Sequence, residues 1–183
     1  MSAFILKLGV VLRLIAGADA QDISIPEQLA AAINQVRPNA SVVTRSDLDW
    51  KSGGPPERDQ IIKADLDGDG RLDYAALLFV PNKPGAERKR DGTVAAGWLV
   101  VFLGRADGSD KSIVLDRHGD KESTGLVDII ITSRAPGVLE EVRSGRKMTL
   151  TLHAIERVWC ERSGTVFFWN RNRGRFESIW TGD

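Results

Sequence analysis

Cysteine is nearly absent from this sequence: Cys160 is the only one among 183 residues. No intramolecular disulfide can form, so the fold cannot depend on a disulfide framework. Cys160 lies in the alternating run "IERVWCER", where a small apolar side chain is expected to be buried. A nucleophilic thiol or an intermolecular bridge is the alternative, although no neighbouring residue marks a site that would stabilise a thiolate.

An excess of either charge is also absent. Lysine and arginine together number 25, as do aspartate and glutamate, and the formal net charge is zero. This balance gives no electrostatic reason to expect a nucleic acid or an anionic membrane as a partner. The hydrophobic content of 42% and charged content of 27% are typical of one globular domain. The sequence shows no Gly-x-Ser-x-Gly, His-Glu-x-x-His or phosphate-cradling glycine loop.

The N-terminus differs from the rest of the chain. Residues 1–20, "MSAFILKLGVVLRLIAGADA", combine an early lysine, an apolar stretch and a closing Ala-Asp-Ala. This order predicts a secretory signal peptide, although Arg13 interrupts the apolar stretch. A membrane anchor or an amphipathic starter helix is the alternative, but an anchor needs about 20 consecutive apolar residues. We therefore expect a single β-rich domain over residues 21–183, without a membrane span, located in the periplasm or secreted.

One helix is predicted near the start of this domain. Ser24 and Glu27 have the spacing of a capping box, and Pro26 suits a first helical turn. Apolar residues then recur at helical spacing until Pro38 stops the pattern. Most of the remaining chain predicts strands, at residues 73–80, 97–104, 111–116, 126–133, 147–155, 155–161, 165–170 and 175–180. The predicted class is α+β, with a mainly antiparallel β-sheet, one N-terminal helix and a calcium loop between strands.

The loop "DLDGDGRLD" carries the most specific chemistry in the sequence. Acidic side chains stand at its positions one, three, five and nine: Asp65, Asp67, Asp69 and Asp73. A calcium loop uses side-chain oxygens at this spacing, a backbone carbonyl at position seven, which is Arg71, and a sharp turn at position six, which is Gly70. Oxygen ligands alone favour calcium over zinc or copper, and magnesium tolerates such crowded cages poorly. A plain Asp-Gly turn with solvated charges is the alternative, but it needs one aspartate rather than four.

The flanks of the loop separate it from an EF-hand. Position twelve is Ala76, so the bidentate glutamate is missing, and the flanking residues predict strands rather than helices. The loop and the following "YAALLF" resemble the calcium loops of FG-GAP and VCBS repeats, as in integrin propellers. A single copy cannot build a propeller. The loop, together with the C-terminal "IERVWCERSGTVFFWNRNRGRFESIWTGD", is similar to small exported bacterial proteins with one such loop. That resemblance implies a calcium-stabilised β-rich domain and no particular activity.

Other candidate sites carry weaker signals. His118 stands between Asp116 and Asp120, an arrangement that suits acid–base chemistry or simply an exposed turn. His153 lies within a predicted strand and is expected to be structural. Tryptophans also fall in predicted strands, where they serve either as core or as a sugar- or peptide-binding face: Trp98, Trp159, Trp169 and Trp180.

The sequence therefore favours an exported, non-enzymatic domain that binds calcium structurally and contacts an unidentified protein or carbohydrate. Two alternatives remain open. One is a hydrolase that uses His118 with Asp116 and Asp120. The other is an inhibitor or immunity protein that acts against an enzyme of the cell envelope, which size and export allow but no residue requires.

Overall fold

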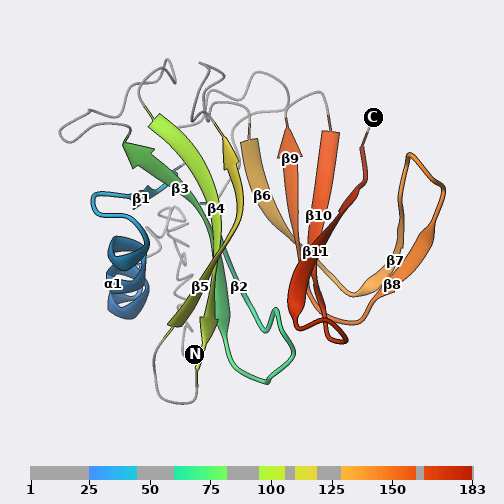
Figure 1. Ribbon diagram of the computed structural model, residues 1–183, viewed down its shortest axis with the longest axis horizontal. Coiled ribbons are helices and arrows are strands. Elements are labelled where there is room, and N and C mark those ends of the chain that lie inside the picture. Colours follow the sequence, from blue (N-terminus) through green and yellow to red (C-terminus); the bar gives the residue numbers. More distant parts are fainter. Residues whose placement is uncertain are drawn as a thin grey trace, which may run out of the picture.

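A computed structural model describes residues 25–44, 60–81, 95–105, 110–118, 129–159 and 163–182. These residues contain one helix and eleven strands (Figure 1). In chain order they are α1 (Glu27–Val36), β1 (Ser41–Val42), β2 (Ile61–Ala64), β3 (Asp73–Pro81), β4 (Ala95–Gly104), β5 (Asp110–His118), β6 (Ile129–Arg134), β7 (Gly137–Glu140), β8 (Lys147–Leu150), β9 (Ala154–Trp159), β10 (Ser163–Asn170) and β11 (Arg175–Trp180).

The strands form two main sheets and one separate hairpin, and all pairings are antiparallel. Sheet A has the order β1-β3-β4-β5, with β2 also paired to β3. Sheet B has the order β11-β10-β9-β6, and β7 pairs with β8 in the hairpin. The prediction of a mainly antiparallel α+β fold with a single N-terminal helix is confirmed for the described residues.

The two central strands of sheet A are apolar on both faces because both faces are covered. One alternating set faces sheet B and builds the core between the sheets; it includes Leu77, Leu99 and Val101, all fully buried. The other set faces α1 and includes Leu78 and Phe102, also fully buried. This two-sided burial explains why β3 and β4 read as continuous apolar runs instead of alternating ones.

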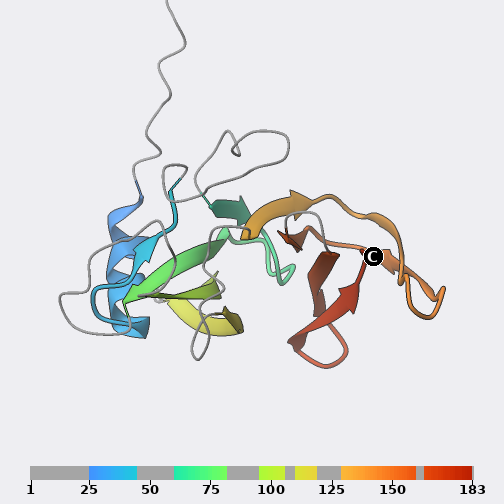
Figure 2. The same cartoon turned by 90° about the horizontal axis from the view of Figure 1, so that it is seen from above.

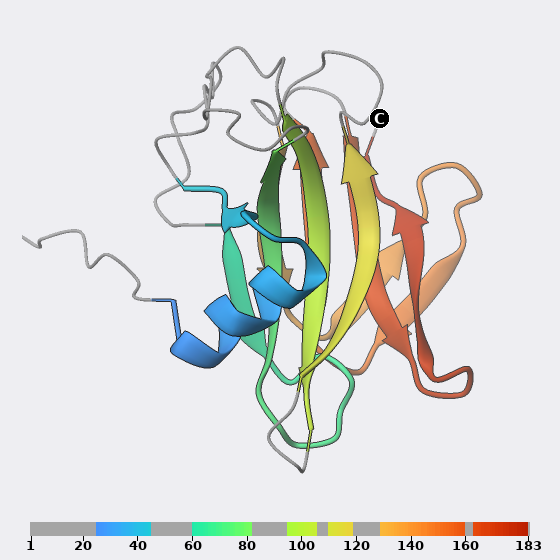
Figure 3. The same ribbon diagram turned by 60° about the vertical axis from the view of Figure 1, so that its left-hand side comes forward.

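Helix α1 lies across the outer face of sheet A (Figure 3). Leu29 and Ile33 are buried one helical turn apart and pack against that face. The helix ends at Val36, before Pro38, as predicted. Its start differs from the prediction: Pro26 occupies the N-cap position without a side-chain cap, and Ser24 lies outside the described residues.

Sheets A and B are joined along one side and diverge toward the other. Figure 2 shows β2 and β6 close together, whereas β5 and β11 lie at the opposite, open side. Gln60, which is 2% exposed, closes the joined side: its Oε1 accepts a hydrogen bond of 2.7 Å from the Ile131 N–H of sheet B. The open side leaves β5 and β11 as the edge strands of their sheets among the described residues.

The single strand predicted over residues 147–155 is wrong. Strand β8 ends at Leu150, and β9 starts at Ala154. The break exists because β8 belongs to the separate hairpin while β9 belongs to sheet B, so the chain must change direction between them. Within the described part of the chain, no helix has the length and apolar character needed to cross a membrane.

Candidate metal site

The aspartate-rich loop connects β2 to β3, which pair as an antiparallel hairpin in which Ala64 stands opposite Asp73. The loop reverses the chain through Gly70, whose φ of 85° lies in the left-handed region that glycine adopts most easily. The predicted sharp turn at loop position six is therefore confirmed. The start and end of the loop, Asp65 and Asp73, are held close together because the hairpin pairing stops directly beside them.

Three of the four aspartates come together. Asp65, Asp67 and Asp73 each offer one carboxylate oxygen, and these oxygens all lie within 4.8 Å of one another. Like charges at this spacing repel, and a divalent cation between them would remove that repulsion. The group consists of oxygen donors only, which is the donor set that calcium and other hard cations prefer.

Asp73 is the buried member of the group, with 0% exposure. Its Oδ2 accepts a hydrogen bond of 2.7 Å from the Leu66 N–H, and its Oδ1 accepts one of 2.9 Å from the Gly104 N–H at the end of β4. Burial raises the pKa of Asp73 above its ordinary value; the two N–H donors oppose this rise, and the nearby Asp67 charge adds to it. Main-chain donors thus orient the carboxylate, and among the described residues no cation forms an ion pair with it.

The other two members are held by backbone N–H groups of the loop itself. Asp65 accepts from Gly68 at 2.7 Å and from Gly70 at 3.0 Å, and Asp67 accepts from Asp69 at 3.1 Å. An ionised carboxylate has about four lone-pair positions, so these bonds orient the oxygens and still leave lone pairs for a cation. The loop can therefore present preformed ligands without breaking its own hydrogen bonds.

The structure does not bring Asp69 into this group. Its Oδ2 pairs with Arg71 Nη1 at 2.9 Å, and its Oδ1 accepts the Arg71 N–H at 2.8 Å. The Arg71 N–H is the main reason that the pKa of Asp69 is lowered. That Asp69 and the Arg71 carbonyl bind the ion therefore stays a prediction.

The loop also contacts sheet B through the turn that joins β10 to β11. A Cβ added to Gly68 would lie 2.3 Å from Arg171 Nη2 and 3.0 Å from Leu152 Cδ1, so these side chains pack directly on the Gly68 backbone. On the other side of the loop, a Cβ on Gly104 would lie 2.8 Å from the Leu72 carbonyl oxygen. The loop thus touches both sheets, and a change in its shape would disturb contacts on each.

His118 belongs to a different cluster, which connects the two sheets at one end of β5. Its Nε2 lies 3.0 Å from Asp116 Oδ2 and 3.0 Å from Arg157 Nη1, and Arg157 also forms an ion pair with Asp116. Arg157 Nη2 donates to Thr165 Oγ1 at 2.9 Å. Burial lowers the pKa of His118; Asp116 favours its cationic form, whereas the guanidinium of Arg157 disfavours it. Asp120 lies outside the described residues.

The arrangement around His118 fits a structural role better than an acid–base role. Its Nε2 is engaged by two charged partners, and its ring packs 5.6 Å from the Trp159 ring. Arg157 was not predicted as a site residue, although its position in the sequence carries a signal. Arg157 shares a strand face with Ile155 and Trp159, both of which pack in the core between the sheets, and an arginine at such a position requires a buried partner.

The tryptophans do not share one face. Trp98 packs on the α1 side of sheet A, with the Arg117 guanidinium 4.3 Å from its ring centre. Trp159 and Trp169 pack against the core between the sheets, and Trp180 lies beneath Arg143 at 5.1 Å. Each is half-buried, as expected for residues at the margins of a core. Cys160 lies outside the described residues.

Comparison of the chain with family models, with curated proteins and with solved structures found no match.

Proposed function

We propose that this chain is an exported, non-enzymatic binding domain whose loop over residues 65–73 holds calcium as a structural ion. The observation that carries the calcium proposal is the convergence of three carboxylates within 4.8 Å, one of them fully buried. A buried, hydrogen-bonded carboxylate whose pKa is raised by burial gains most from a cation, because the cation supplies the missing counter-charge.

The ligands in this proposal are the predicted set. Asp65, Asp67 and Asp73 supply the converging oxygens, and Asp69 and the Arg71 carbonyl complete the coordination. Asp69 would have to release the Arg71 side chain, which is exposed and able to turn into solvent. Calcium is preferred to magnesium because it accepts many protein oxygens in a flexible geometry.

The structural role follows from what the loop touches. Asp73 is bonded to the end of β4, and Gly68 lies against the β10–β11 turn of sheet B. An ion that fixes the loop would therefore stabilise contacts on both sheets. If calcium binds only the folded state, it adds about 2.7 kcal/mol to the free energy of unfolding at a calcium concentration 100 times the Kd. For a domain of this size that corresponds to a rise in melting temperature of roughly 5–10 °C.

Thermal unfolding of metal-depleted protein tests this proposal. We expect calcium to raise the melting temperature by that amount and magnesium to raise it much less. Asp65→Asn should lose most of the calcium effect. Glu140→Gln is a matched control, because Glu140 is an exposed carboxylate on β7 that pairs only with Lys147, at 3.5 Å, among the described residues. An equal calcium effect in both variants would refute the assignment.

Export to the periplasm or the medium is part of the same proposal and is supported by the order of residue types in residues 1–20. N-terminal sequencing of the protein recovered outside the cytoplasm tests it, with Gln21 as the expected first residue. The hydrolase and inhibitor alternatives stay predictions. The packing of His118 between Asp116 and Arg157 gives the hydrolase little support.

A further inference from the structure

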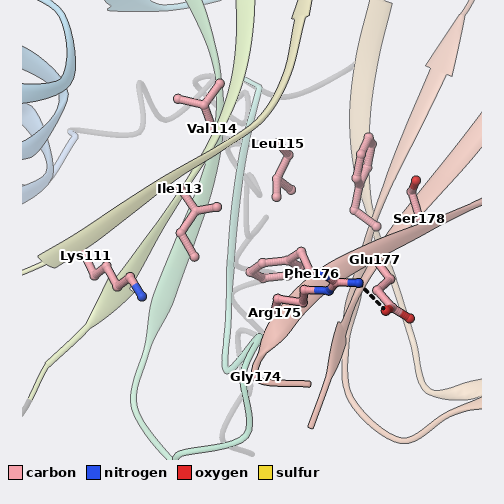
Figure 4. Close-up of a pocket in the computed structure, with 10 residues that line it drawn as sticks. Lys111, Ile113, Val114, Leu115, Gly174, Arg175, Phe176, Glu177 and Ser178 are labelled. Carbon is pink, nitrogen blue, oxygen red and sulfur yellow. Dashed lines mark ion pairs between the residues drawn. The ribbon is translucent and has the colours of Figure 1, made fainter. Parts of the chain in front are cut away.

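A groove of about 470 Å³ opens where sheets A and B diverge (Figure 4). One wall is the edge strand β5, and the other is formed by β10 and β11. The apolar side chains of Ile113, Leu115 and Phe176 point into it (Figure 4), and Phe167 also lines it. Val114, between the first two, faces the α1 side of sheet A instead. The groove thus continues the apolar core between the sheets.

Strand β11 offers main-chain hydrogen-bonding groups along this groove. The Trp180 carbonyl points away from β10 and accepts a hydrogen bond of 3.2 Å from the Val142 N–H, outside the sheet. The next N–H along the chain, that of Thr181, points toward β10 and donates to the Gly164 carbonyl at 2.9 Å. Main-chain groups alternate in direction along a strand. Phe176 and Ser178 therefore direct their N–H and C=O away from β10, as Trp180 does.

Among the described residues, no main-chain partner meets these outward groups of Phe176 and Ser178. Strand β5 is likewise paired on one side only within the described chain. An edge strand with unpaired groups is a template for an additional strand. A strand placed here would pair with β11 and lie over the apolar wall of β5.

The rim of the groove is positively charged. Lys111 is exposed and has no ion-pair partner among the described residues, and the Arg175 side chain is 65% exposed. Glu177, the acidic residue among those that line the groove, pairs with Arg173 at 2.7 Å and with Arg175 at 3.6 Å (Figure 4), and the side-chain amide of Asn170 lowers its pKa. One carboxylate thus stands against three cations, Lys111, Arg173 and Arg175, so the rim keeps a positive charge that favours an acidic partner.

We propose that this groove binds an extended, acidic polypeptide segment by strand addition to β11. Alternate apolar side chains of the segment would enter between the two sheets, and its carboxylates would meet Lys111 and Arg175. A polypeptide fits better than a sugar because the site pairs apolar walls with main-chain donors and acceptors at strand spacing. The inference extends the proposed role as a binding domain and does not depend on the calcium loop.

Fluorescence anisotropy with the full chain tests the proposal. The probe is a labelled short peptide of alternating valine and aspartate, and the comparison peptide alternates valine and lysine. We expect saturable binding of the acidic peptide and at least roughly tenfold weaker binding of the basic one. N-methylation of alternate amides in one register should abolish binding, while methylation in the other register should have little effect, because only one register donates to β11.

Arg175→Glu should weaken acidic-peptide binding about tenfold and strengthen basic-peptide binding. Arg146→Glu on the separate hairpin is the matched control, since its side chain is 64% exposed and lies away from the groove. Unchanged melting temperatures would establish that both variants fold. Equal peptide affinities in both variants, or equal binding of both N-methylated peptides, would overturn strand addition at this groove.

The proposal would also be overturned if the groove proved to bind either of two other occupants. A dimer in sedimentation velocity that Arg175→Glu disrupts, and that the acidic peptide fails to displace, would assign the groove to a second copy. Peptide binding to residues 21–183 but not to the full chain would assign it to the N-terminal segment. Calcium titration of Arg175→Glu separates this inference from the calcium proposal: calcium binding should be unchanged even where peptide binding is lost.

Discussion

Replacing Asp73 by asparagine separates its two roles, as a hydrogen-bond acceptor and as a proposed calcium ligand. The side chain is fully buried, and each carboxylate oxygen accepts one main-chain N–H, from Leu66 at 2.7 Å and from Gly104 at 2.9 Å. Asparagine keeps the shape but exchanges one oxygen for an NH₂ group. That group would face an N–H donor, so one buried hydrogen bond is lost and one buried donor is left without a partner.

The expected magnitude differs with and without calcium. An unsatisfied buried donor costs about 1–3 kcal/mol. In metal-depleted protein the loss in free energy of unfolding should lie at the lower end of this range. Asparagine also removes a buried charge, that of a carboxyl group whose pKa is raised by burial. At a calcium concentration 100 times the Kd, the variant also forfeits the binding contribution of about 2.7 kcal/mol. The total loss in free energy of unfolding should then reach about 4 kcal/mol.

Urea unfolding at pH 7, with calcium and with chelator, measures both values. We expect the free energy of unfolding of Asp73→Asn to fall further below that of wild type in calcium than in chelator. An identical loss in the two conditions would show that Asp73 does not bind the ion. No loss in chelator would show that the two main-chain hydrogen bonds contribute nothing measurable. Glu140→Gln should behave like wild type in both.

Three further predictions concern the surroundings of the loop and the joints between the sheets. Gly104→Ala should lower the free energy of unfolding by about 1–3 kcal/mol and weaken calcium binding, because its Cβ would meet a loop carbonyl at 2.8 Å; urea unfolding and calcium titration check this. Gln60→Leu should lower the free energy of unfolding, measured in urea, by about 1–3 kcal/mol, because it leaves the buried Ile131 N–H of β6 without its acceptor. A loss near zero would show that this hydrogen bond does not help to join the two sheets. Burial lowers the pKa of His118, so the unfolded chain takes up a proton that the folded state resists, and stability should fall as pH drops through about 6.5. His118→Gln should reduce that pH dependence, and an unchanged pH profile of the melting temperature would refute the argument.

The hairpin and the loop were predictable because their signals are local. The spacing of Asp65, Asp67 and Asp73 within nine residues, flanked by apolar runs, indicated both the turn and the converging carboxylates. Asp69 shows the limit of spacing alone. Arg71 stands two residues further on, and its side chain and N–H both engage Asp69, an interaction that a ligand pattern does not take into account.

The contacts between the sheets were not predictable in the same way. Gln60, Arg157 and Arg171 act across distances of many residues, and their partners are set by how sheets A and B pack. The groove depends on the same packing, because β5 and β11 become neighbours only when the sheets join at their opposite side. Of these residues, Arg157 alone carried a sequence signal, an arginine on the core-facing side of a strand.

Isothermal titration of the metal-depleted protein with calcium measures whether the loop over residues 65–73 binds this ion. We expect saturable binding at one site per chain, much weaker binding of magnesium, and loss of the calcium signal in Asp65→Asn while its far-ultraviolet circular dichroism stays that of wild type. Absence of a saturable signal at millimolar calcium in correctly folded wild-type protein would show that the loop is not a calcium site.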